Sequence, residues 1–486
     1  MRGAARPRTG MRTSFQRTLV LIPIIMSIVV IVAVDAELRL KQLHVITRHG
    51  SRYPLTKNAN TLSEGTEGTL TPLGQKQLYD LGLWLRQLYS AFSVFDTYIP
   101  SKVRLESSSF ERTVSSANAL ALGLFPPATR DPTGESMLPV SPANVPVYTT
   151  EVKNDVTIRA YDKCETFLTR LDDLYASQKW QNLEQGNAEL LTRLANIPAF
   201  QVYADRFEKV PLAELWNVFD AIHVAQTECN GGGQLAPSPT CLNLPDPSIV
   251  DVLNDEDWTN VQKLSHRAEL LKYGTETAGR LVGGNLMLQI LGRMQGEDVG
   301  RASADFEKFY LYSGHYPSIL AVFAALNNAP IESEVIPSYA SALIFEVYLD
   351  DVLGGARLVR ILYKSGDDNE QKPVILDNIC TFGEATYCNL KTMTSFFSNL
   401  SLEGWCQDCE NDGADVCLKT LVESKGSCSS SDLEIPVAVG WFTGILTSLI
   451  IFIATCLVQK QRQRSVCSSK MEERTEALSV EGAIIA

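Results

Sequence analysis

The chain is 486 residues long, 45% of its residues are hydrophobic, and its formal net charge is −13. This length and hydrophobic content exclude a disordered protein and predict one large domain with an inserted subdomain. The acidic balance argues against nucleic acid as a partner and against general polyanion binding, so any affinity for phosphate must come from a local site.

Residues 1–36 have the pattern of a secretory signal peptide. Five arginines precede the apolar run 19–34, and small residues around Ala36 suit a cleavage site before Glu37. The alternative is an uncleaved anchor helix, which Pro23 and the shortness of the run disfavour. We therefore expect the mature chain to begin at residue 37.

The next residues alternate between strand and helix patterns. The apolar run 43–47 predicts a strand, and a helix is expected to begin at Thr71 and Pro72, because leucines then recur at helical spacing. A second strand at about 102–106 precedes a helix over 111–124. This order is typical of a layered α/β domain.

Between about 150 and 300 the pattern changes to long amphipathic stretches, which predict an inserted helical subdomain. The α/β pattern returns with a strand at 309–312 and a helix at 319–326, and the runs 342–348 and 358–363 predict a hairpin. We expect a mixed, mostly parallel sheet that is flanked by helices.

The C-terminal part predicts a membrane anchor. Residues 436–458 form a run without a charge that is long enough to cross a bilayer as one helix. Basic residues follow at once, so the tail 459–486 is expected in the cytoplasm. We predict a type I single-pass protein of the plasma membrane or of an endosomal or lysosomal membrane. Its exoplasmic domain would span 37–408 and its stalk 409–435.

Nine of the eleven cysteines lie on the predicted exoplasmic side, where disulfides form. Nine is odd, so at least one thiol is expected to stay free or to pair between chains. Cys229 and Cys241 are expected to close an exposed loop, whereas Cys406 and Cys409 lack a second ligand pair for zinc. Residues 399–401, Asn-Leu-Ser, are a glycosylation sequon.

Residues 48–54, with the sequence RHGSRYP, directly follow the first predicted strand. Open α/β sheets place their ligands at the carboxyl ends of strands. Two arginines and a histidine at such an end predict an anion-sized pocket. We interpret this stretch as a phosphate-binding site that carries a nucleophile.

Further segments carry a family pattern. The stretch 48–54 fits the motif RHGxRxP, and the segments 70–77 (LTPLGQKQ), 111–127 (beginning ERT and ending GLFPP) and 313–315 (SGH) continue the match. Over about residues 38–410 the chain resembles the histidine acid phosphatases, in particular their membrane-anchored members.

The resemblance implies a reaction in which neutral His49 attacks phosphorus in line and water hydrolyses the resulting phosphohistidine. Arg48, Arg52 and Arg112 would hold the phosphoryl oxygens, because a guanidinium fork matches phosphate geometry. His315 would add a further donor. No metal and no cofactor is required, since these groups supply the positive charge. Taken alone, Arg112 would be interpreted as a solvated surface charge.

The resemblance also bears on the remaining cysteines and histidines. One half of the pair Cys406 and Cys409 is expected to bridge to Cys164, with a redox-active pair as the alternative. Cys380 and Cys388 would form a second, local bridge. The three histidines that match no motif are interpreted as structural: His44, His223 and His266.

The sequence departs from the family directly after His315. There the family has an acidic residue that protonates the leaving oxygen, and this chain has Tyr316. A tyrosine with a pKa of about 10 is a poor acid under acidic conditions, and loss of a general acid costs on the order of 10² to 10⁴ in rate. Three outcomes stay open. Another carboxylic acid donates the proton, from the insertion or from Glu64 or Glu67; Tyr316 donates it; or turnover is low.

We therefore expect a lumenal or cell-surface acid phosphomonoesterase that acts on phosphomonoesters through a phosphohistidine. The alternative is a weak or inactive membrane receptor or trafficking protein that binds phosphorylated ligands on a phosphatase fold. An inositol phosphate phosphatase also stays open, because one sequence gives no pocket size. A homodimer is left open as the assembly.

Overall fold

The structure is a computed structural model of the chain. It describes residues 38–418 apart from the segments 56–66, 126–144, 207, 230–240, 242–248, 250, 297–307, 328–335, 351–354, 367–369, 381–385 and 412. The expected signal peptide (1–36), span (436–458) and tail (459–486) lie outside the described residues, as do most of the stalk and Glu64. Among the helices that are described, none has the length and apolar character to cross a membrane.

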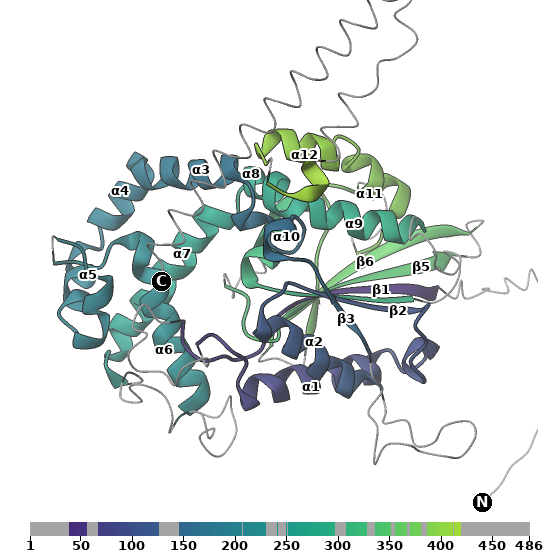
Figure 1. The fold of residues 1–486 in the computed structure, drawn as a ribbon, viewed down its shortest axis with the longest axis horizontal. Coiled ribbons are helices and arrows are strands. Elements are labelled where there is room, and N and C mark those ends of the chain that lie inside the picture. The colour runs from purple at the N-terminus through teal and green to yellow at the C-terminus, as the bar shows by residue number, and fades with distance from the viewer. Residues whose placement is uncertain are drawn as a thin grey trace, which may run out of the picture. The chain divides into compact units, whose positions relative to one another are not determined.

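The described part of the chain is built around one eight-stranded sheet with the strand order β3-β2-β4-β1-β5-β6-β7, in which β8 also pairs with β6 (Figure 1). The strands are β1 (Arg39–Arg48), β2 (Val103–Ser107), β3 (Val147–Thr149), β4 (Lys308–Gly314), β5 (Ala342–Asp350), β6 (Ala356–Lys364), β7 (Gln371–Pro373) and β8 (Cys388–Asn389).

The sheet is mixed, as predicted. Strands β3, β2, β4 and β1 are parallel neighbours. Strand β5 is antiparallel to β1, and β6 is antiparallel to β5 and so runs in the direction of β1. The expected hairpin is the pair β5 and β6. The parallel half of the sheet therefore brings the carboxyl ends of β1, β2 and β4 to one edge.

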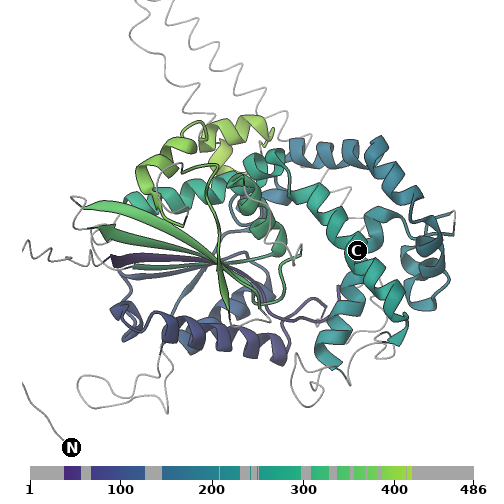
Figure 2. The same ribbon diagram turned by 180° about the vertical axis from the view of Figure 1, so that it is seen from behind.

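Helices cover both faces of the sheet (Figures 1 and 2). Helices α1 (Pro72–Leu88) and α2 (Glu111–Leu124) lie on one face, and α9 (Gly284–Gln295), α10 (Tyr316–Ala325) and α11 (Leu390–Phe396) lie on the other.

Strand β1 is buried from both sides because it lies between these two helical layers. Leu43 and Val45 pack in the core that contains α1 and α2, whereas Ile46 packs in the core that contains α9 and α10. A strand covered on both faces has a continuous apolar run, which is the pattern that predicted β1.

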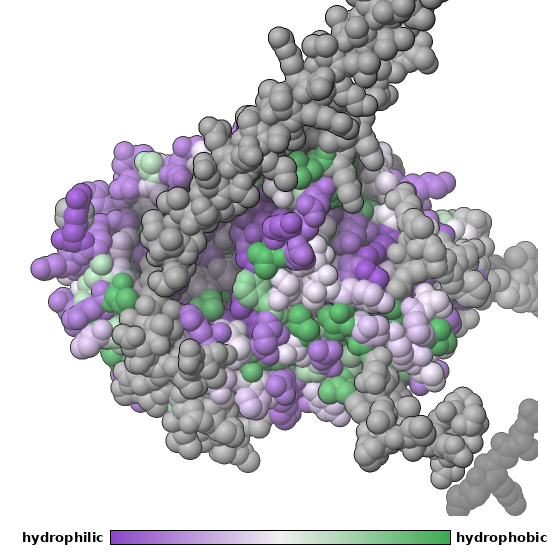
Figure 3. Space-filling model, in the orientation of Figure 1, coloured by the Kyte–Doolittle hydropathy of each residue, from purple (hydrophilic) through white to green (hydrophobic). Residues whose placement is uncertain are grey.

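The predicted helical insertion forms a second group of helices, seen as an arch beside the sheet in Figures 1 and 2. Its members are α3 (Glu165–Ala176), α4 (Gln178–Gln185), α5 (Ala188–Ala195), α6 (Leu215–Cys229) and α7 (Asp255–Tyr273). Side chains of α4 to α7 share one buried cluster, which includes Trp180 and Leu264. Figure 3 shows that this face of the molecule is hollowed between the insertion and α10.

The insertion is shorter than the sequence suggested. The amphipathic stretch 261–293 is not continuous, because α7 ends at Tyr273 with Gly274 as its C-cap. Thr275 then caps a new helical turn by accepting the N–H of Ala278 at 3.2 Å. The following α9 packs its side chains on the sheet instead of on the insertion.

Four disulfides join described cysteines: Cys164–Cys409, Cys229–Cys241, Cys380–Cys388 and Cys406–Cys417. The first three are the expected pairs, and the redox-active alternative for the CxxC pair is wrong because each of its cysteines bonds elsewhere. The fourth was not predicted. Ala414 and Cys417 are fully buried, so packed structure continues past residue 408, where the sequence placed the end of the domain. Cys428 lies outside the described residues.

Candidate active site

The two histidine motifs meet at one edge of the sheet. Strands β1 and β4 are parallel, and their register pairs Arg48 with Gly314. The N–H of His49 donates to the carbonyl oxygen of Gly314 at 3.1 Å, and His315 is the next residue. The rings of His49 and His315 therefore lie with their centroids 5.5 Å apart.

His49 has the form that a nucleophile needs. Its Nδ1 lies 2.8 Å from the carbonyl oxygen of Gly50 and donates to it, which leaves the lone pair on Nε2. Burial lowers the pKa of His49 well below its usual value, and the positive charges of Arg112 and Arg48 lower it further. The imidazole is therefore neutral under mildly acidic conditions.

Two glycines let the His49 loop pack against the first turn of α1. A Cβ at Gly50 would lie 2.3 Å from the carbonyl oxygen of Gly74, and a Cβ at Gly74 would lie 2.0 Å from that of Ser51. The N–H of Gly50 donates to Ser116 Oγ at 3.1 Å, and the N–H of Ser51 donates to Gln77 Oε1 at 2.7 Å. The family segments 70–77 and 111–127 thus support the loop.

Arg48 and Arg52 come from the same loop and are each only 2% exposed. Nη1 of Arg48 donates to the carbonyl oxygen of Pro337 at 2.6 Å, and its guanidinium carbon lies 4.1 Å from the ring centroid of Tyr339. Nη2 of Arg52 forms an ion pair with Asp220 at 2.8 Å. Both guanidinium groups are fixed in place before any ligand binds.

Arg112, the second residue of α2, joins this cationic cluster. Burial lowers its pKa to about 10, and repulsion from Arg52 contributes. The Nε atoms of Arg48, Arg52 and Arg112 are buried and have no hydrogen-bond partner in the described part of the chain. A bound oxyanion would supply these missing partners and offset the repulsion between the arginines.

His315 stands at the N-cap of α10 and is held by a hydrogen bond. Its Nε2 lies 2.9 Å from Ser108 Oγ, which in turn lies 2.8 Å from Thr113 Oγ1. Burial lowers the pKa of His315 well below its usual value, and the positive charges of Arg112 and Arg159 lower it further. The structure therefore brings all five predicted site residues to one place.

Two buried carboxylates of α6 also reach the site, and sequence reasoning missed them. Asp220 pairs with Arg52 as described above. Glu228, which is fully buried, accepts hydrogen bonds from Ser51 Oγ and, at 2.7 Å, from Thr71 Oγ1. The sequence did contain a signal for them, because Asp220 lies among apolar residues of the stretch 212–227 and Glu228 follows it directly.

Tyr316 is turned toward the insertion. Its hydroxyl donates to Glu269 Oε2 at 2.7 Å, and Lys272 Nζ donates to Glu269 Oε1 at 2.7 Å. Burial raises the pKa of Tyr316 well above its usual value, and the charge of Glu269 raises it further. The phenol therefore stays neutral, with its proton engaged by Glu269. Glu67, one of the proposed donors, is exposed.

Of the remaining histidines, only His223 borders the cationic cluster, because it stacks on Tyr339, the ring that Arg48 also contacts. His44 is fully buried in β1. His223 stacks between Phe219 and Tyr339, with centroid distances of 5.3 and 5.2 Å, and His266 contacts Phe219 edge-on. Burial lowers the pKa of His223 to about 3. Across the described residues, no group of three or more His, Cys, Asp or Glu side chains is placed to hold a metal ion.

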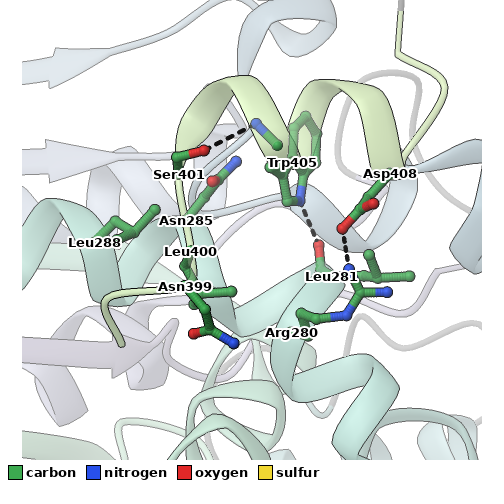
Figure 4. Close-up of a pocket in the computed structure, with 11 residues that line it drawn as sticks. Arg280, Leu281, Asn285, Leu288, Asn399, Leu400, Ser401, Trp405 and Asp408 are labelled. Atoms are coloured by element: carbon green, nitrogen blue, oxygen red, sulfur yellow. Dashed lines mark hydrogen bonds and ion pairs between the residues drawn. The ribbon is translucent and has the colours of Figure 1, made fainter. Parts of the chain in front are cut away.

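A separate pocket of about 170 Å³ lies between α9 and α12 (Leu402–Asp408) and is lined by none of the predicted site residues (Figure 4). Asn399 of the sequon lines it and is exposed. Arg280 and Asp408 form an ion pair beside it, and Trp405 Nε1 donates to the carbonyl oxygen of Leu281 at 2.7 Å.

The site thus combines a neutral histidine with clustered arginines at the carboxyl ends of parallel strands, an arrangement that is suited to binding an oxyanion. The chain belongs to the histidine phosphatase superfamily (branch 2), because the model of that family matches residues 58–364.

The relatives described next are both named acid phosphatases. The chain is 25% identical to lysosomal acid phosphatase of Rattus norvegicus over 431 residues, which cover 87% of this chain and 89% of that protein. It is 26% identical to prostatic acid phosphatase of Bos taurus over 388 residues, which cover 77% and 89%. The family match and these relatives support a phosphatase of the histidine type.

Solved structures agree with the fold. The phytase of Citrobacter braakii matches with a TM-score of 0.55 at 13% identity, covering 76% of this chain and 99% of the phytase. The phytase of Klebsiella sp. ASR1 matches with a TM-score of 0.55 at 16% identity, covering 75% and 97%. At these identities the likeness shows the fold alone.

Proposed function

We propose that the chain is a lumenal or cell-surface acid phosphomonoesterase that acts through a phosphohistidine at His49. The observation that carries this proposal is the buried, neutral His49, whose Nε2 is left to attack beside the cationic groups of Arg48, Arg52, Arg112 and His315. The family match begins at residue 58, so the role of the His49 loop is supported by this geometry.

The reaction follows from these groups. His49 Nε2 forms a bond to phosphorus while the ester P–O bond opposite to it breaks, and the electron pair leaves on the ester oxygen. Arg48, Arg52 and Arg112 offer preorganised N–H donors to the other three oxygens, where charge must be stabilised in the transition state. Water then attacks the phosphohistidine, which releases phosphate and restores His49.

An acid optimum is supported by the lowered pKa of His49. An imidazole with the ordinary pKa of about 6.5 would be mostly protonated, and so not nucleophilic, at about pH 5. His49 keeps its lone pair there because protonation would add a charge to a buried cationic cluster. The rate is therefore expected to persist as the pH falls through 6.5.

An exoplasmic location is supported by the four disulfides, since such bonds persist in oxidising compartments. The exposed Asn399 of the sequon is compatible with a glycoprotein. Lysosomal acid phosphatase is among the relatives, which supports the secretory route. The signal peptide, the membrane span and the homodimer stay predictions from the sequence.

The test is hydrolysis of p-nitrophenyl phosphate by the full chain, purified in detergent, at about pH 5. We expect release of phosphate by the wild type and its loss in His49→Ala, because the substitution removes the nitrogen that would take the phosphoryl group. The matched control is His266→Ala, which removes a histidine of the same domain outside the phosphate-binding cluster and should keep the activity. Wild-type hydrolysis no faster than that of His49→Ala contradicts the proposal.

The second candidate function, a receptor or trafficking protein that binds phosphorylated ligands, is favoured by one observation. The residue after His315 is Tyr316, whose proton is engaged by Glu269. This candidate expects phosphate or vanadate to bind while turnover is absent, and it fails if the wild type hydrolyses alkyl phosphates well.

A further inference from the structure

A fourth arginine lies beside the phosphate-binding cluster. Arg159 belongs to the segment between β3 and α3, just before the short helix η4 (Ala160–Asp162). Its guanidinium carbon lies 4.2 Å from the ring centroid of Phe110, and that of Arg112 lies 4.5 Å from the same centroid. His315 meets this ring edge-on at 5.7 Å. Arg159, Arg112 and His315 are thus grouped around one phenyl ring.

Arg159 has hydrogen-bonding capacity that this part of the chain does not use. Its side chain is 11% exposed, and its Nη2 forms an ion pair with Asp162. Nε and Nη1 are buried and lack a hydrogen-bond partner among the described residues. A buried N–H group without a partner is costly, so an oxygen atom of a ligand at this position would be bound favourably.

The backbone holds Arg159 in place without a ligand. Oδ1 of the buried Asp155 accepts the N–H groups of Ile158 at 2.9 Å and of Arg159 at 3.3 Å. Ser318 Oγ, from the first turn of α10, donates to the carbonyl oxygen of Ile158 at 2.5 Å. The segment is therefore tied to the same helix that carries His315 at its start. The ion pair with Asp162 holds the side chain, so the guanidinium group loses little entropy when it binds an anion.

The side of the site on which Arg159 stands follows from its neighbours. Arg159 and His315 both contact the ring of Phe110, and Tyr161, two residues after Arg159, meets the ring of His315 edge-on at 6.1 Å. The ring of His49 lies on another side of His315, with Tyr339 as its second aromatic neighbour. Arg159 therefore lies on the His315 side of the site. In an in-line displacement the leaving oxygen lies opposite the nucleophile, which is the side away from His49.

We propose that Arg159 is a fourth arginine of the active site, which faces the leaving group, and that the leaving oxygen departs as an anion paired with Arg159. The proposal rests on the proposed function. In this step the bond from His49 Nε2 to phosphorus forms and the ester P–O bond breaks. The electron pair stays on the leaving oxygen, which takes a proton from water after departure. Arg159 thereby does part of the work of the acidic residue that Tyr316 replaces.

The substrate class follows from this assignment. An oxygen that departs without a proton must carry its negative charge through the transition state, and an aromatic ring delocalises that charge whereas an alkyl group does not. The preferred substrates are therefore aryl phosphate monoesters. Alkyl phosphates should react slowly, because one fixed cation stabilises an alkoxide less than a proton does.

The experiment compares a series of substituted phenyl phosphates, from p-nitrophenyl to unsubstituted phenyl, with glycerol 2-phosphate as the alkyl ester. It uses the full chain at about pH 5 and measures kcat/KM for the wild type, Arg159→Ala and Arg159→Lys. The matched control is Arg280→Ala, which removes an arginine that pairs with Asp408 away from the site. Binding of inorganic phosphate by each variant reports that the cluster of Arg48, Arg52 and Arg112 is still formed.

For Arg159→Ala we expect kcat/KM to fall about 10-fold with p-nitrophenyl phosphate and on the order of 10² to 10³ with phenyl phosphate, which is the range for loss of one charge-stabilising donor. The dependence on the leaving group therefore becomes steeper. Arg159→Lys should recover part of the loss because it keeps the charge, and Arg280→Ala should match the wild type.

Three results overturn the inference. The first is an equal loss across the whole series in Arg159→Ala, which indicates a structural role. The second is no loss at all, and the third is a wild type that hydrolyses glycerol 2-phosphate as fast as phenyl phosphate. Failure of the proposed function itself looks different, because every substrate would then show no hydrolysis above that of His49→Ala.

Discussion

The half of the site at the end of β1 and the half at the start of α10 are built in different ways. At the end of β1, Arg48, His49 and Arg52 come from one loop that packs against α1 through Gly50 and Gly74. At the start of α10, Tyr316 is held by a carboxylate of the insertion. The proposed nucleophile and most of the proposed phosphate-binding groups therefore depend on the sheet and its loops. The α10 half depends on what α7 and the segment around Arg159 contribute.

The largest expected effect is on the β1 half. Replacing His49 by Ala should lower kcat by on the order of 10³-fold or more, because the covalent step is lost. Inorganic phosphate should still bind, since the three arginines remain. Steady-state kinetics and calorimetric titration check the two expectations separately. A His49→Ala enzyme with a tenth of the wild-type kcat or more would show that another residue takes the phosphoryl group.

The next effect concerns the close packing of Gly74 in α1 against the loop that carries His49. Gly74→Ala should lower the free energy of unfolding by about 3 kcal/mol, because its Cβ would lie 2.0 Å from the carbonyl oxygen of Ser51 and the loop must move. Urea unfolding measures the loss. The control is Gly413→Ala, where nothing lies within 4 Å of the new Cβ. Equal stability of the two variants would mean that the close packing of the loop is unimportant.

On the α10 half, Tyr316→Asp should raise kcat/KM for glycerol 2-phosphate by about 10²-fold, because a carboxylic acid then follows His315. Hydrolysis of p-nitrophenyl phosphate should change little. Tyr316→Phe is the matched variant, since it keeps the ring and removes only the hydroxyl. If Tyr316→Phe loses the hydrolysis of poor leaving groups that the wild type performs, the tyrosine is itself the proton donor.

How much the sequence predicts differs between the same two halves. The strand at 43–47, the helices beginning at Pro72 and Glu111 and the hairpin of β5 and β6 follow from local patterns, and the structure has each of them. The RHGSRYP stretch supplied His49 and two arginines as candidates, and the structure places these three buried side chains at the end of β1. Their roles stay predictions.

The contacts between segments far apart in the chain could not be predicted. In the α10 half, Glu269 reaches Tyr316 and Arg159 reaches Phe110, and in the β1 half Glu228 reaches Ser51. A single sequence shows the periodicity of a helix but not which of its faces meets which loop. These partners were therefore missed, although each is an ionisable residue.

The smallest expected effect is on the pH dependence of the free energy of unfolding. The pKa of His223 is lowered to about 3 by burial and then by Arg48 and Arg52, whereas the unfolded chain has the ordinary value of about 6.5. The unfolded state therefore binds more protons between these values. The stabilisation is complete above pH 6.5 and is lost as the pH falls toward 3.

Between pH 6.5 and 5 the free energy of unfolding is expected to fall by about 1 kcal/mol. This is less than the whole pKa difference of His223 would give, because its side chain is only partly buried. His223→Phe, which keeps the stacking on Phe219 and Tyr339, should lose correspondingly less stability over this range. Urea unfolding at the two pH values measures it. An identical loss in wild type and variant would place the pH dependence on other groups.

The most direct test of the central claim, that His49 is the nucleophile, is to trap the phosphoenzyme. The full chain is mixed with an aryl phosphate that carries radioactive phosphorus, quenched in alkali and digested, and the label is mapped to a residue. The account predicts a label that is stable to alkali and labile to acid, located on His49 and absent from His49→Ala. Turnover without a labelled His49, or a label on another residue, would contradict it.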